Sequence, residues 1–568
     1  MDKRWVYQQE APQEAVEQLA QSLKISPTLA GIMCQRGICT FEEARHFFRP
    51  TLTDLHDPFL MKDMDRAVNR LNEALHANEK ILVYGDYDVD GTTSVALMYS
   101  FLQQHTDQVE LYIPDRYKEG YGVSQQGVDW AAEQGYTLIV SLDCGIKSAD
   151  KVAYAATKGI DFIICDHHLP DDDVPQAVAV LDPKRIDCPY PYKELSGCGV
   201  GFKLIQAFCQ QNGLALDSVY RLLDLLVVSI AADIVPITGE NRVLAYYGLQ
   251  LLNGPGPLRP GLDALKELAG ISSEMDITSI VFGFAPRINA AGRMGDAKNS
   301  VRMLLAQTKE EAIRTADIIN ESNKARRDKD TNITKEALQM IEDDEFLRSA
   351  NSTVLYKETW HKGVIGIVAS RCIEKYYRPT IILTHSNGKA SGSARSVHGF
   401  NVHSAIESCS DLLEQFGGHM YAAGLTLPIE NVPAFRERFE QVVAGTITEE
   451  QKIPQIEVDA VIELNQVTRN FYNIIRQMEP FGPGNMRPVF VSECVYDTGS
   501  VRVVGDSHLK LRLTQDGFYS IDAIGFGLSD YYPLISKGIP FDVCYTVEEN
   551  VYRGVSSLQL RIKDIRVK

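Results

Sequence analysis

The hydrophobic positions of the 568-residue chain form two patterns. In the first half, short apolar runs alternate with segments in which apolar residues recur every three or four positions. The runs lie at 81–84, 109–114, 137–142, 162–165 and 178–181, and the clearest amphipathic segments lie at 63–77 and 92–103. Short apolar runs predict buried strands, and the recurring positions predict helices. Their alternation predicts an α/β domain with a doubly wound parallel sheet.

Toward the carboxyl end, the pattern changes to short strands separated by turn residues. These lie at 455–461, 489–496, 509–513, 521–526, 541–546 and 558–562. Six short strands of this kind predict a small β-barrel. Residues 308–345 are instead polar, charged and helical in propensity, and they lack a sustained apolar face. Such a segment is typical of a helix that bridges two domains.

These patterns divide the chain into five predicted segments. We expect an N-terminal helical cap, the doubly wound domain, a connecting helix, a smaller second domain and the barrel, at residues 1–60, 61–307, 308–345, 350–445 and 455–568 respectively. The cap should contain helices at 13–23 and 41–48. No apolar run approaches a membrane span, and the start of the chain lacks the apolar stretch of a signal peptide. We therefore expect a cytoplasmic protein without membrane association.

The 11 cysteines are scattered and form no CxxC pair, which predicts reduced thiols in preference to disulfides or a zinc site. The glycine-rich stretch 196–201 (SGCGVG) could be taken for a dinucleotide-binding loop. That interpretation lacks an evident preceding strand and a ribose-binding acid at the right distance. We attribute these glycines to helix packing instead.

The strand predicted at 81–84 is followed by three aspartates at alternate positions, Asp86, Asp88 and Asp90. Carboxylates this close repel one another, and a hard divalent cation such as Mg²⁺ or Mn²⁺ allows them to stay ionised together. The alternative is a solvated aspartate-rich loop or a Ca²⁺ loop. An EF-hand is excluded because no glutamate follows at the required spacing and the flanks are a strand and then a helix.

Two further predicted strands also end in potential ligands. Asp143 follows the strand at 137–142, and Asp166, His167 and His168 follow the strand at 162–165. The carboxyl ends of parallel strands meet at one edge of a sheet, so these groups should share a crevice with the three aspartates. Asp233 ends a nearly all-apolar segment and, as a buried carboxylate, it too needs a partner. The sequence therefore predicts a mixed carboxylate and imidazole metal site.

The formal net charge of −18 argues against a nucleic-acid partner unless basic residues are locally concentrated. The carboxyl-terminal segment offers such a concentration in Arg553, Arg561, Lys563, Arg566 and Lys568; the alternative is a merely solvated basic tail. Residues 388–396 combine small side chains with Lys389 and Arg395, a composition that could hold phosphate oxygens.

The motifs together are specific to one family. They are GDYDVDG (85–91), SLDCG (141–145), DHH (166–168), AADIVP (231–236), RINAAGR (287–293), WHKGVIGIVASR (360–371), GGH (417–419) and EPFGPGN (479–485). By these motifs the chain closely resembles the DHH phosphoesterase superfamily and, within it, the RecJ-type single-strand-specific exonucleases. The resemblance covers most of the chain. One departure is Met486, where we expect a proline after EPFGPGN.

The resemblance implies a metal centre with two Mn²⁺ ions, or Mg²⁺ as the alternative. Asp88 and Asp143 would hold one ion, and Asp90, Asp143, His167 and Asp233 would hold the other. The remaining catalytic residues would be Asp86 as a nearby liganding or supporting group, Asp166 as the group that orients an imidazole, and His168 as a donor to the phosphate. Tyr84 stands where related phosphoesterases have a first histidine, so the first ion would be held more weakly.

The resemblance also implies the substrate: single-stranded DNA, degraded from 5′ to 3′ into 5′-mononucleotides during recombination and repair. It predicts a smaller α/β DHHA1 domain at 350–445, joined by the long helix, and an OB-fold at 455–568. The implied substrate-binding residues are Arg116, Arg287, Asn289, Arg293, His361, Ser393, Arg395, Gly417, Gly418, His419, Lys510 and Arg553. We expect a monomer that cooperates with a single-strand-binding protein and a helicase.

Three other functions are compatible with parts of this pattern. An oligoribonuclease or cyclic-dinucleotide phosphodiesterase needs the same metal cluster, but the chain length and the C-terminal barrel argue against so small a substrate. A non-catalytic replication scaffold is disfavoured because every metal-binding position is intact. A pyrophosphatase-like activity is disfavoured because the first histidine is absent.

Overall fold

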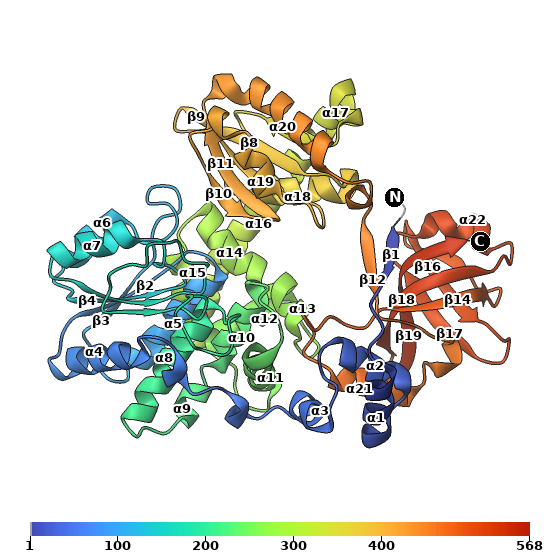
Figure 1. Ribbon diagram of the computed structural model, residues 1–568, viewed down its shortest axis with the longest axis horizontal. Coiled ribbons are helices and arrows are strands. Elements are labelled where there is room, and N and C mark those ends of the chain that lie inside the picture. Colours follow the sequence, from blue (N-terminus) through green and yellow to red (C-terminus); the bar gives the residue numbers. More distant parts are fainter. Residues whose placement is uncertain (1–2, 568) are drawn as a thin grey trace. The chain divides into compact units, whose positions relative to one another are not determined.

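The computed structural model describes residues 3–567, which fold into two compact units (Figure 1). The first, which we call the α/β unit, comprises residues 10–323 and 468–487. The second unit comprises the other described residues. A segment from the carboxyl-terminal part of the chain, 468–487, therefore folds with the α/β unit. Within residues 3–567, no helix is both long and apolar enough to span a bilayer.

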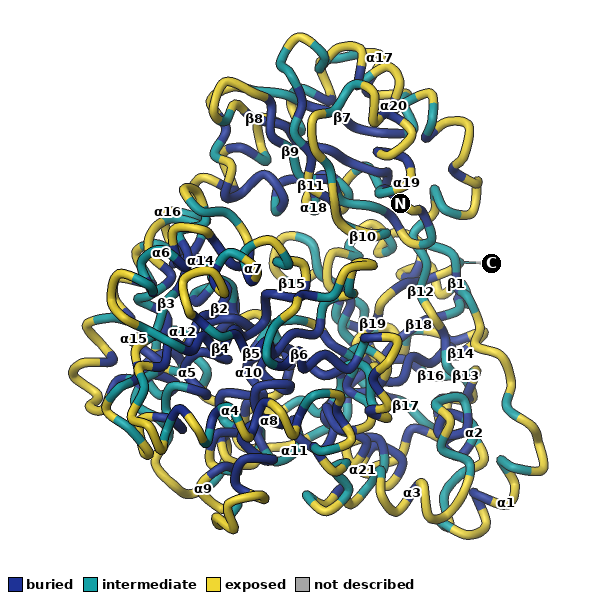
Figure 2. The backbone as a smooth tube through the Cα atoms, turned by 60° about the vertical axis from the view of Figure 1, so that its left-hand side comes forward, coloured by how far each residue is buried: buried dark blue, intermediate teal, exposed yellow. Residues whose placement is uncertain are grey.

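The α/β unit is built on a five-stranded sheet in the order β3-β2-β4-β5-β6, and every neighbouring pair is parallel. Its strands are β2 (Ile81–Gly85), β3 (Val109–Tyr112), β4 (Leu138–Leu142), β5 (Asp161–Cys165) and β6 (Ala179–Leu181). Strands β2 and β4 are buried along their whole length (Figure 2). The predicted doubly wound parallel sheet is confirmed.

Helices cover both faces of this sheet because its strands are apolar on both sides. Side chains from α4 (Met64–His76), α5 (Val89–Leu102), α8 (Gly197–Gln211) and α10 (Leu223–Ala232) share the larger core with one face. Helices α6 (Gln125–Glu133) and α7 (Ala149–Thr157) contribute to the core on the other face. The carboxyl ends of β2, β4 and β5 are thereby left as the edge at which polar residues gather.

The α/β unit contains further α-helices. They are α1 (Gln13–Leu23), α2 (Pro27–Gln35), α3 (Phe41–Phe48), α9 (Asp217–Tyr220), α11 (Gly239–Asn253), α12 (Pro260–Ala269), α13 (Ile277–Ser279), α14 (Ala285–Met294), α15 (Lys298–Leu305) and α21 (Arg469–Gln477). A π-helical turn, η3 (Ile280–Phe284), leads into α14. The predicted connecting helix is α16 (Lys309–Asp343), which passes from the α/β unit into the second unit.

The second unit contains a five-stranded sheet in the order β10-β11-β9-β8-β7. Its strands are β7 (Thr353–Tyr356), β8 (Thr380–Ser386), β9 (Lys389–Arg395), β10 (Gln415–His419) and β11 (Ala422–Leu427). Helices α19 (Val402–Glu407) and α20 (Val432–Thr446) share one core with this sheet, while α17 (Glu345–Ser349) and α18 (Ile365–Tyr376) share another with the end of α16. This mixed α/β fold occupies the segment expected to be a smaller domain.

The rest of the second unit is a closed β-sheet. Its order is β13-β14-β18-β19-β17-β16-β15, and an additional pairing of β14 with β16 closes it into a barrel. Its elements are β13 (Ala460–Val461), β14 (Phe490–Asp497), β15 (Arg502–Val504), β16 (His508–Thr514), β17 (Ser520–Gly525), β18 (Phe541–Tyr552), β19 (Val555–Val567) and a short helix, α22 (Tyr532–Ile535). The predicted barrel is confirmed.

The beginning of the barrel segment differs from the expected single strand at 455–461. Strand β12 (Gln455–Val458) leaves the barrel and pairs in parallel with β1 (Arg4–Tyr7). Trp5 of β1 is buried, and its indole Nε1 donates to Asp564 over 2.7 Å. The sequence pattern could not predict this pairing, because nothing local indicates a partner about 450 residues away.

Candidate metal centre

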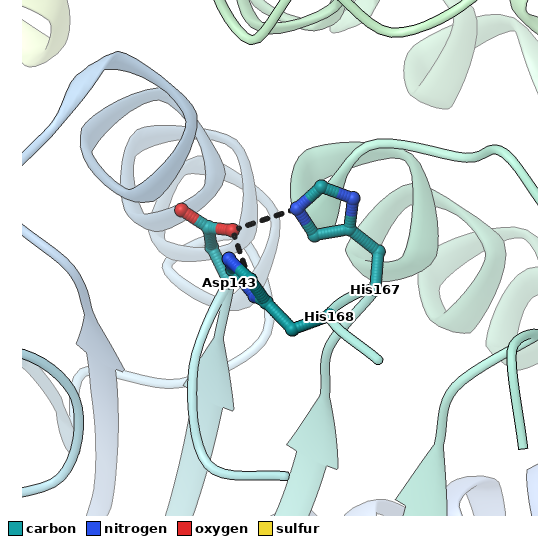
Figure 3. A group of neighbouring side chains, drawn as sticks. All are labelled: Asp143, His167 and His168. Atoms are coloured by element: carbon teal, nitrogen blue, oxygen red, sulfur yellow. Dashed lines mark ion pairs between the residues drawn. The ribbon is translucent and has the colours of Figure 1, made fainter. Parts of the chain in front are cut away.

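The predicted ligands meet at the carboxyl edge of the parallel sheet. His167 Nε2 lies 3.2 Å from Asp143 Oδ1, 3.6 Å from Asp233 Oδ2 and 3.7 Å from Asp90 Oδ2. His168 Nδ1 lies 4.0 Å from Asp143 Oδ1, so both imidazoles approach the same carboxylate oxygen (Figure 3). Residues from β4, β5, α5 and α10 are therefore brought into one cluster, as the sequence predicted.

Asp143 lies at the centre of this cluster. It follows β4 directly, adopts a left-handed backbone conformation (φ 58°), and donates its amide to the Cys165 carbonyl on β5 over 2.9 Å. Only 2% of the residue is exposed. Burial, followed by the charges of Asp90 and Asp88, raises the pKa of Asp143 well above its ordinary value. A cation is needed to hold this carboxylate in its ionised form.

The neighbouring carboxyls show the same tendency. Burial and then the charge of Asp88 raise the pKa of Asp86, and burial and then the charge of Asp90 raise the pKa of Asp88. Burial together with Asp90 raises the pKa of Asp233 to about 8. Oδ1 of Asp86 and Oδ1 of Asp143 are buried, and neither accepts a hydrogen bond from any described residue. Buried carboxylate oxygens that accept no hydrogen bond and lie among like charges fit a site for divalent cations.

Asp90 is fixed by the amino terminus of α8. Gly197 N donates to its Oδ2 over 2.7 Å and Cys198 N donates to its Oδ1 over 2.9 Å, while the Ser229 hydroxyl donates to Oδ1 over 2.7 Å. These donors orient the carboxylate without neutralising it. The glycine-rich stretch that we attributed to helix packing thus also supports the site. The sequence does carry one sign of this role: a serine N-cap, Ser196, is followed by a glycine at the start of an apolar helix.

Asp166 holds His168. Its Oδ1 is 2.8 Å from His168 Nδ1, and its carboxylate also accepts from the amides of Ile146 and His167. Burial opposes the charge of Asp166, but the hydrogen bond and charge of His168, with the amide of Ile146, together outweigh burial and lower the pKa of Asp166 to about 2. In the same way, burial disfavours a charged His168, but the hydrogen bond with Asp166 and the charges of Asp166, Asp233 and Asp88 together raise its pKa to about 9. His168 is thus a cationic donor beside the cluster at neutral pH.

Tyr84 does not join the cluster. Its side chain is fully buried on the side of the sheet covered by α6 and α7. The hydroxyl donates to the Gly122 carbonyl over 3.1 Å and accepts from Ser124 N over 3.0 Å. Tyr84 thereby fastens the loop next to Tyr121, whose hydroxyl lies 3.1 Å from His168 Nε2. Sequence reasoning missed Tyr121, although it lies in a turn-rich stretch after a strand.

The arginines predicted to bind substrate in the α/β unit differ in their surroundings. The Arg116 guanidinium lies 4.8 Å from the centre of the ring of Tyr87, the residue that follows Asp86. Arg287 instead donates to the carbonyls of Gly283 and Leu268, so it ties α14 to η3 and α12. Asn289 and Arg293 are half-buried on α14. These roles in binding remain predictions.

Ser393 and Arg395 lie together on β9 of the second unit. Arg395 Nη1 donates to Ser393 Oγ over 3.0 Å and to the Ala394 carbonyl over 2.7 Å. No carboxylate of the described residues forms an ion pair with Arg395, and burial lowers its pKa. A Cβ on Gly366 of α18 would lie 2.9 Å from both side chains. This is a half-buried cation with hydroxyl and backbone groups around it.

The other predicted contacts of the second unit are spread over its elements. Gly417, Gly418 and His419 are exposed on β10, and His361 Nδ1 accepts from Gly363 N over 3.1 Å. In the barrel, Lys510 of β16 lies in one cross-strand row with Arg502, Ile524 and Arg561. Arg553 is exposed in the turn after β18, 5.2 Å from the Tyr552 ring. Lys568 lies outside the described residues.

Comparison with known families gives three matches along the chain. The description "DHH family, N-terminal domain" matches residues 80–230, "DHHA1 domain" matches 350–445 and "RecJ OB domain" matches 458–564. The first match contains the strands and acidic turns of the metal centre except Asp233. The second contains Ser393 and Arg395, and the third contains Lys510 and Arg553.

Individual relatives match over nearly the whole chain. The single-stranded-DNA-specific exonuclease RecJ of Bacillus subtilis (strain 168) is 38% identical over 570 residues, which cover 99% of this chain and 71% of that protein. The crystal structure of RecJ from Thermus thermophilus in complex with Mn²⁺ has a TM-score of 0.85 at 26% identity, covering 100% of this chain and 80% of that one. The structure of the Thermus thermophilus protein with Mg²⁺ has a TM-score of 0.79 at 25% identity, covering 100% and 78%.

Proposed function

Because the chain belongs to the RecJ family of single-stranded-DNA-specific exonucleases, we propose that it degrades single-stranded DNA by metal-dependent phosphodiester hydrolysis. The observation that carries this proposal is the convergence of three carboxylates on His167 Nε2 within 3.7 Å, at the edge of a parallel sheet. We further propose that degradation runs from 5′ to 3′, releases 5′-mononucleotides and serves recombination and repair.

The metal centre takes Mn²⁺ or Mg²⁺, two ions per site. Asp88 and Asp143 are the proposed ligands of one ion, and Asp90, Asp143, His167 and Asp233 of the other. The donor set of carboxylates and one imidazole suits either metal. When bound, such ions lower the pKa of a water and stabilise charge on the attacking and leaving oxygens. The chain contributes a buried carboxylate, Asp143, close to both imidazoles.

His168 and Arg116 are the proposed contacts to the scissile phosphate and its neighbour. The hydrogen bond that His168 donates to Asp166 favours a protonated His168, so its imidazolium can also donate to a phosphate oxygen that gains negative charge. Arg116 is held against the face of Tyr87, which orients the guanidinium without neutralising it. Both groups would favour the transition state over the bound substrate.

Arg395 and Ser393 are the proposed pocket for the 5′ end. Arg395 is half-buried, and the partial desolvation of an arginine without a carboxylate partner carries a cost that a bound anion would offset. A terminal 5′-phosphate supplies that anion and can accept two guanidinium N–H groups at once. Gly366 leaves room for the phosphate, because any side chain there would contact both residues.

The barrel is the proposed holder of the strand beyond the cleavage site. The cross-strand row through Arg502, Lys510 and Arg561 offers cations along one face. The Phe526 ring lies beside it, with the Arg561 guanidinium 5.2 Å from its centre. Cations next to aromatic rings bind the backbone and stack on the bases of single strands without sequence preference.

Several expectations complete the proposal. The segment boundaries at 60, 307, 345 and 445 remain a proposed domain division. We also propose that the protein acts as a monomer in the cytoplasm, together with a single-strand-binding protein and a helicase.

The proposal is tested with three substrates in the presence of Mn²⁺. These are a single-stranded oligonucleotide labelled at its 3′ end, the same oligonucleotide in a duplex, and a short RNA dinucleotide. We expect the labelled single strand alone to give a ladder that shortens from its 5′ end. Cleavage of the dinucleotide alone would assign the chain to the small-substrate branch, and firm DNA binding without any cleavage would favour a scaffold.

A further inference from the structure

The turn that follows Asp233 is in an unusual conformation. Asp233 ends α10, and the next residue, Ile234, has a positive φ of 60°. A β-branched residue is strained in this region, and such a conformation persists only where the surroundings impose it. The Ile234 side chain does not impose it, since 62% of the residue is exposed and it lines a hollow of about 890 Å³. Something else must fix the backbone that aims Asp233.

Residues 478–487, which we call the strap, contact this turn. They belong to the α/β unit although they lie between barrel strands β13 and β14 in the sequence. Ile237, four residues after Asp233, donates its amide to the Pro483 carbonyl over 2.7 Å. A Cβ on Gly482 would lie 2.5 Å from Ile237 Cγ1, and a Cβ on Gly484 would lie 2.9 Å from Thr238 Cγ2. The two glycines allow the strap to lie directly against the turn.

The strap has the geometry of a preformed β-turn. Asn485 N donates to the Gly482 carbonyl over 2.8 Å, with Pro483 at the second position and Gly484 (φ 73°) at the third. Proline followed by a residue with positive φ is the signature of a type II turn. The Pro483 carbonyl is therefore free of the turn's own hydrogen bond and accepts from Ile237.

The far side of the strap is fixed to helices of the α/β unit. The buried Asn485 side chain donates to the carbonyls of Met478 and Pro480 over 2.9 and 2.8 Å, and its Oδ1 accepts from Arg36 after α2 over 2.6 Å. Arg242 of α11 donates to the Met478 carbonyl over 2.9 Å. One side of the strap is thus held by Arg36, Arg242 and the Asn485 side-chain amide. The other side packs against the turn after Asp233.

From this geometry we propose that the strap positions Asp233 for metal binding. Resting on the proposed function, the inference gives the EPFGPGN motif a role as a brace for a metal ligand, with Gly482 and Asn485 as positioning residues. The strap holds Ile237 through the hydrogen bond to Pro483, three residues after the strained Ile234, and thereby restrains the short segment that carries Asp233. Loosening or displacing the strap should lower the affinity for the ion that Asp233 binds and leave the rest of the metal centre intact.

The test is an electron paramagnetic resonance titration of Mn²⁺ into the full-length protein, with the Gly482→Ala variant compared to wild type. We expect the affinity for one of two ions to fall about 10- to 100-fold, the usual effect of removing a group that supports a ligand. Gly256→Ala is the matched control, since that exposed loop glycine has no atom within 4 Å of a built Cβ. Unchanged affinity in Gly482→Ala would overturn the inference.

A double-mutant cycle tests whether the contact between Gly482 and Ile237 is responsible for the loss of Mn²⁺ affinity. In an Ile237→Ala background, the added Cβ no longer meets Cγ1, so Gly482→Ala should cause no further loss of Mn²⁺ affinity. A further loss would overturn the proposed route through Ile237. If Gly482→Ala does not unfold cooperatively, and so is not properly folded, the same Mn²⁺ titration is carried out on Asn485→Ala. The affinity of that variant then decides whether the strap supports the ion. If the wild-type protein binds no Mn²⁺, the proposed metal centre itself is refuted. If the wild-type protein binds two Mn²⁺ ions and the variants bind them with the same affinity, only the proposed role of the strap is refuted.

Discussion

Gly197 N donates a hydrogen bond to Asp90 Oδ2 over 2.7 Å, and a Cβ on Gly197 would lie 2.6 Å from Asp143 Cβ. One glycine therefore brings the amino terminus of α8 against two proposed metal ligands that are 53 residues apart in the sequence. No larger residue could occupy this position without moving Asp143.

We predict that Gly197→Ala weakens Mn²⁺ binding by at least about tenfold and reduces hydrolysis, because the added Cβ displaces Asp143 and shifts the amide that donates to Asp90. Isothermal titration of Mn²⁺ measures the first effect directly. Gly199→Ala, on the same helix, is the control, since its Cβ would make only an ordinary contact at 3.4 Å. Equal Mn²⁺ affinity in both variants would show that the close approach of α8 is unimportant.

We predict that Tyr84→Phe lowers kcat and leaves Mn²⁺ affinity unchanged. The substitution removes the hydroxyl that fastens Gly122 and Ser124 next to Tyr121, at a cost of about 1–3 kcal/mol in unfolding free energy. Calorimetry of the metal-free protein measures the loss of unfolding free energy, and a Mn²⁺ titration measures the affinity for the ion. A weakened Mn²⁺ site would mean that Tyr84 supports an ion after all. Tyr154→Phe, which removes a hydroxyl bonded to Asp129 away from the site, is the control.

We predict that Arg395→Ala raises KM for a 5′-phosphorylated single strand by about 10- to 100-fold, the value of one or two charge-assisted hydrogen bonds. An oligonucleotide with a 5′-hydroxyl should be affected far less. Arg438→Ala on the exposed face of α20 serves as the comparison. If the preference for a 5′-phosphate survives in Arg395→Ala, this residue is not in the end-binding pocket.

Asp182, at the carboxyl end of β6, gives a prediction about pH. Burial raises its pKa to about 7, and among the described residues its buried Oδ2 has no hydrogen-bond partner. An unfolded aspartate titrates near about 3.9, so the folded protein binds this proton more tightly, and stability falls as pH rises from about 4 to about 7.

Asp182→Asn, which mimics the protonated form, should therefore stabilise the protein above pH 7 by a few kcal/mol. It should have little effect near pH 4. Chemical denaturation in the presence of a chelator, at both pH values, measures this difference. A variant that is equally stable or less stable than wild type above pH 7 would contradict the assignment.

The strands and acidic turns could be predicted because their signal is local. An apolar run that ends in aspartate or histidine predicts both a buried strand and a polar group at its carboxyl end, and parallel topology then places Asp143 and His167 together. The family resemblance added which of these groups we propose as ligands of the ions, and it led us to expect the fold of the second unit.

Other features have no local signal. The burial of Tyr84 away from the cluster depends on the alternation of side chains along β2, and the use of Gly197 depends on where α8 packs. The pairing of β1 with β12 and the association of the strap with Ile237 join segments that are hundreds of residues apart. Arg287 resembled a substrate ligand, yet its guanidinium bonds to two carbonyls. Such placements follow from tertiary packing and become visible only in the structure.

The most direct test of the metal centre is the Asp143→Asn variant, which keeps the size of the side chain and removes its charge. Mn²⁺ binding, single-strand binding in chelator and hydrolysis of a 3′-labelled single strand are measured on the same preparation. We predict that hydrolysis becomes undetectable and Mn²⁺ binding is reduced, while the affinity for the strand is retained. Hydrolysis at the wild-type rate by Asp143→Asn would contradict the assignment of this cluster as the catalytic site.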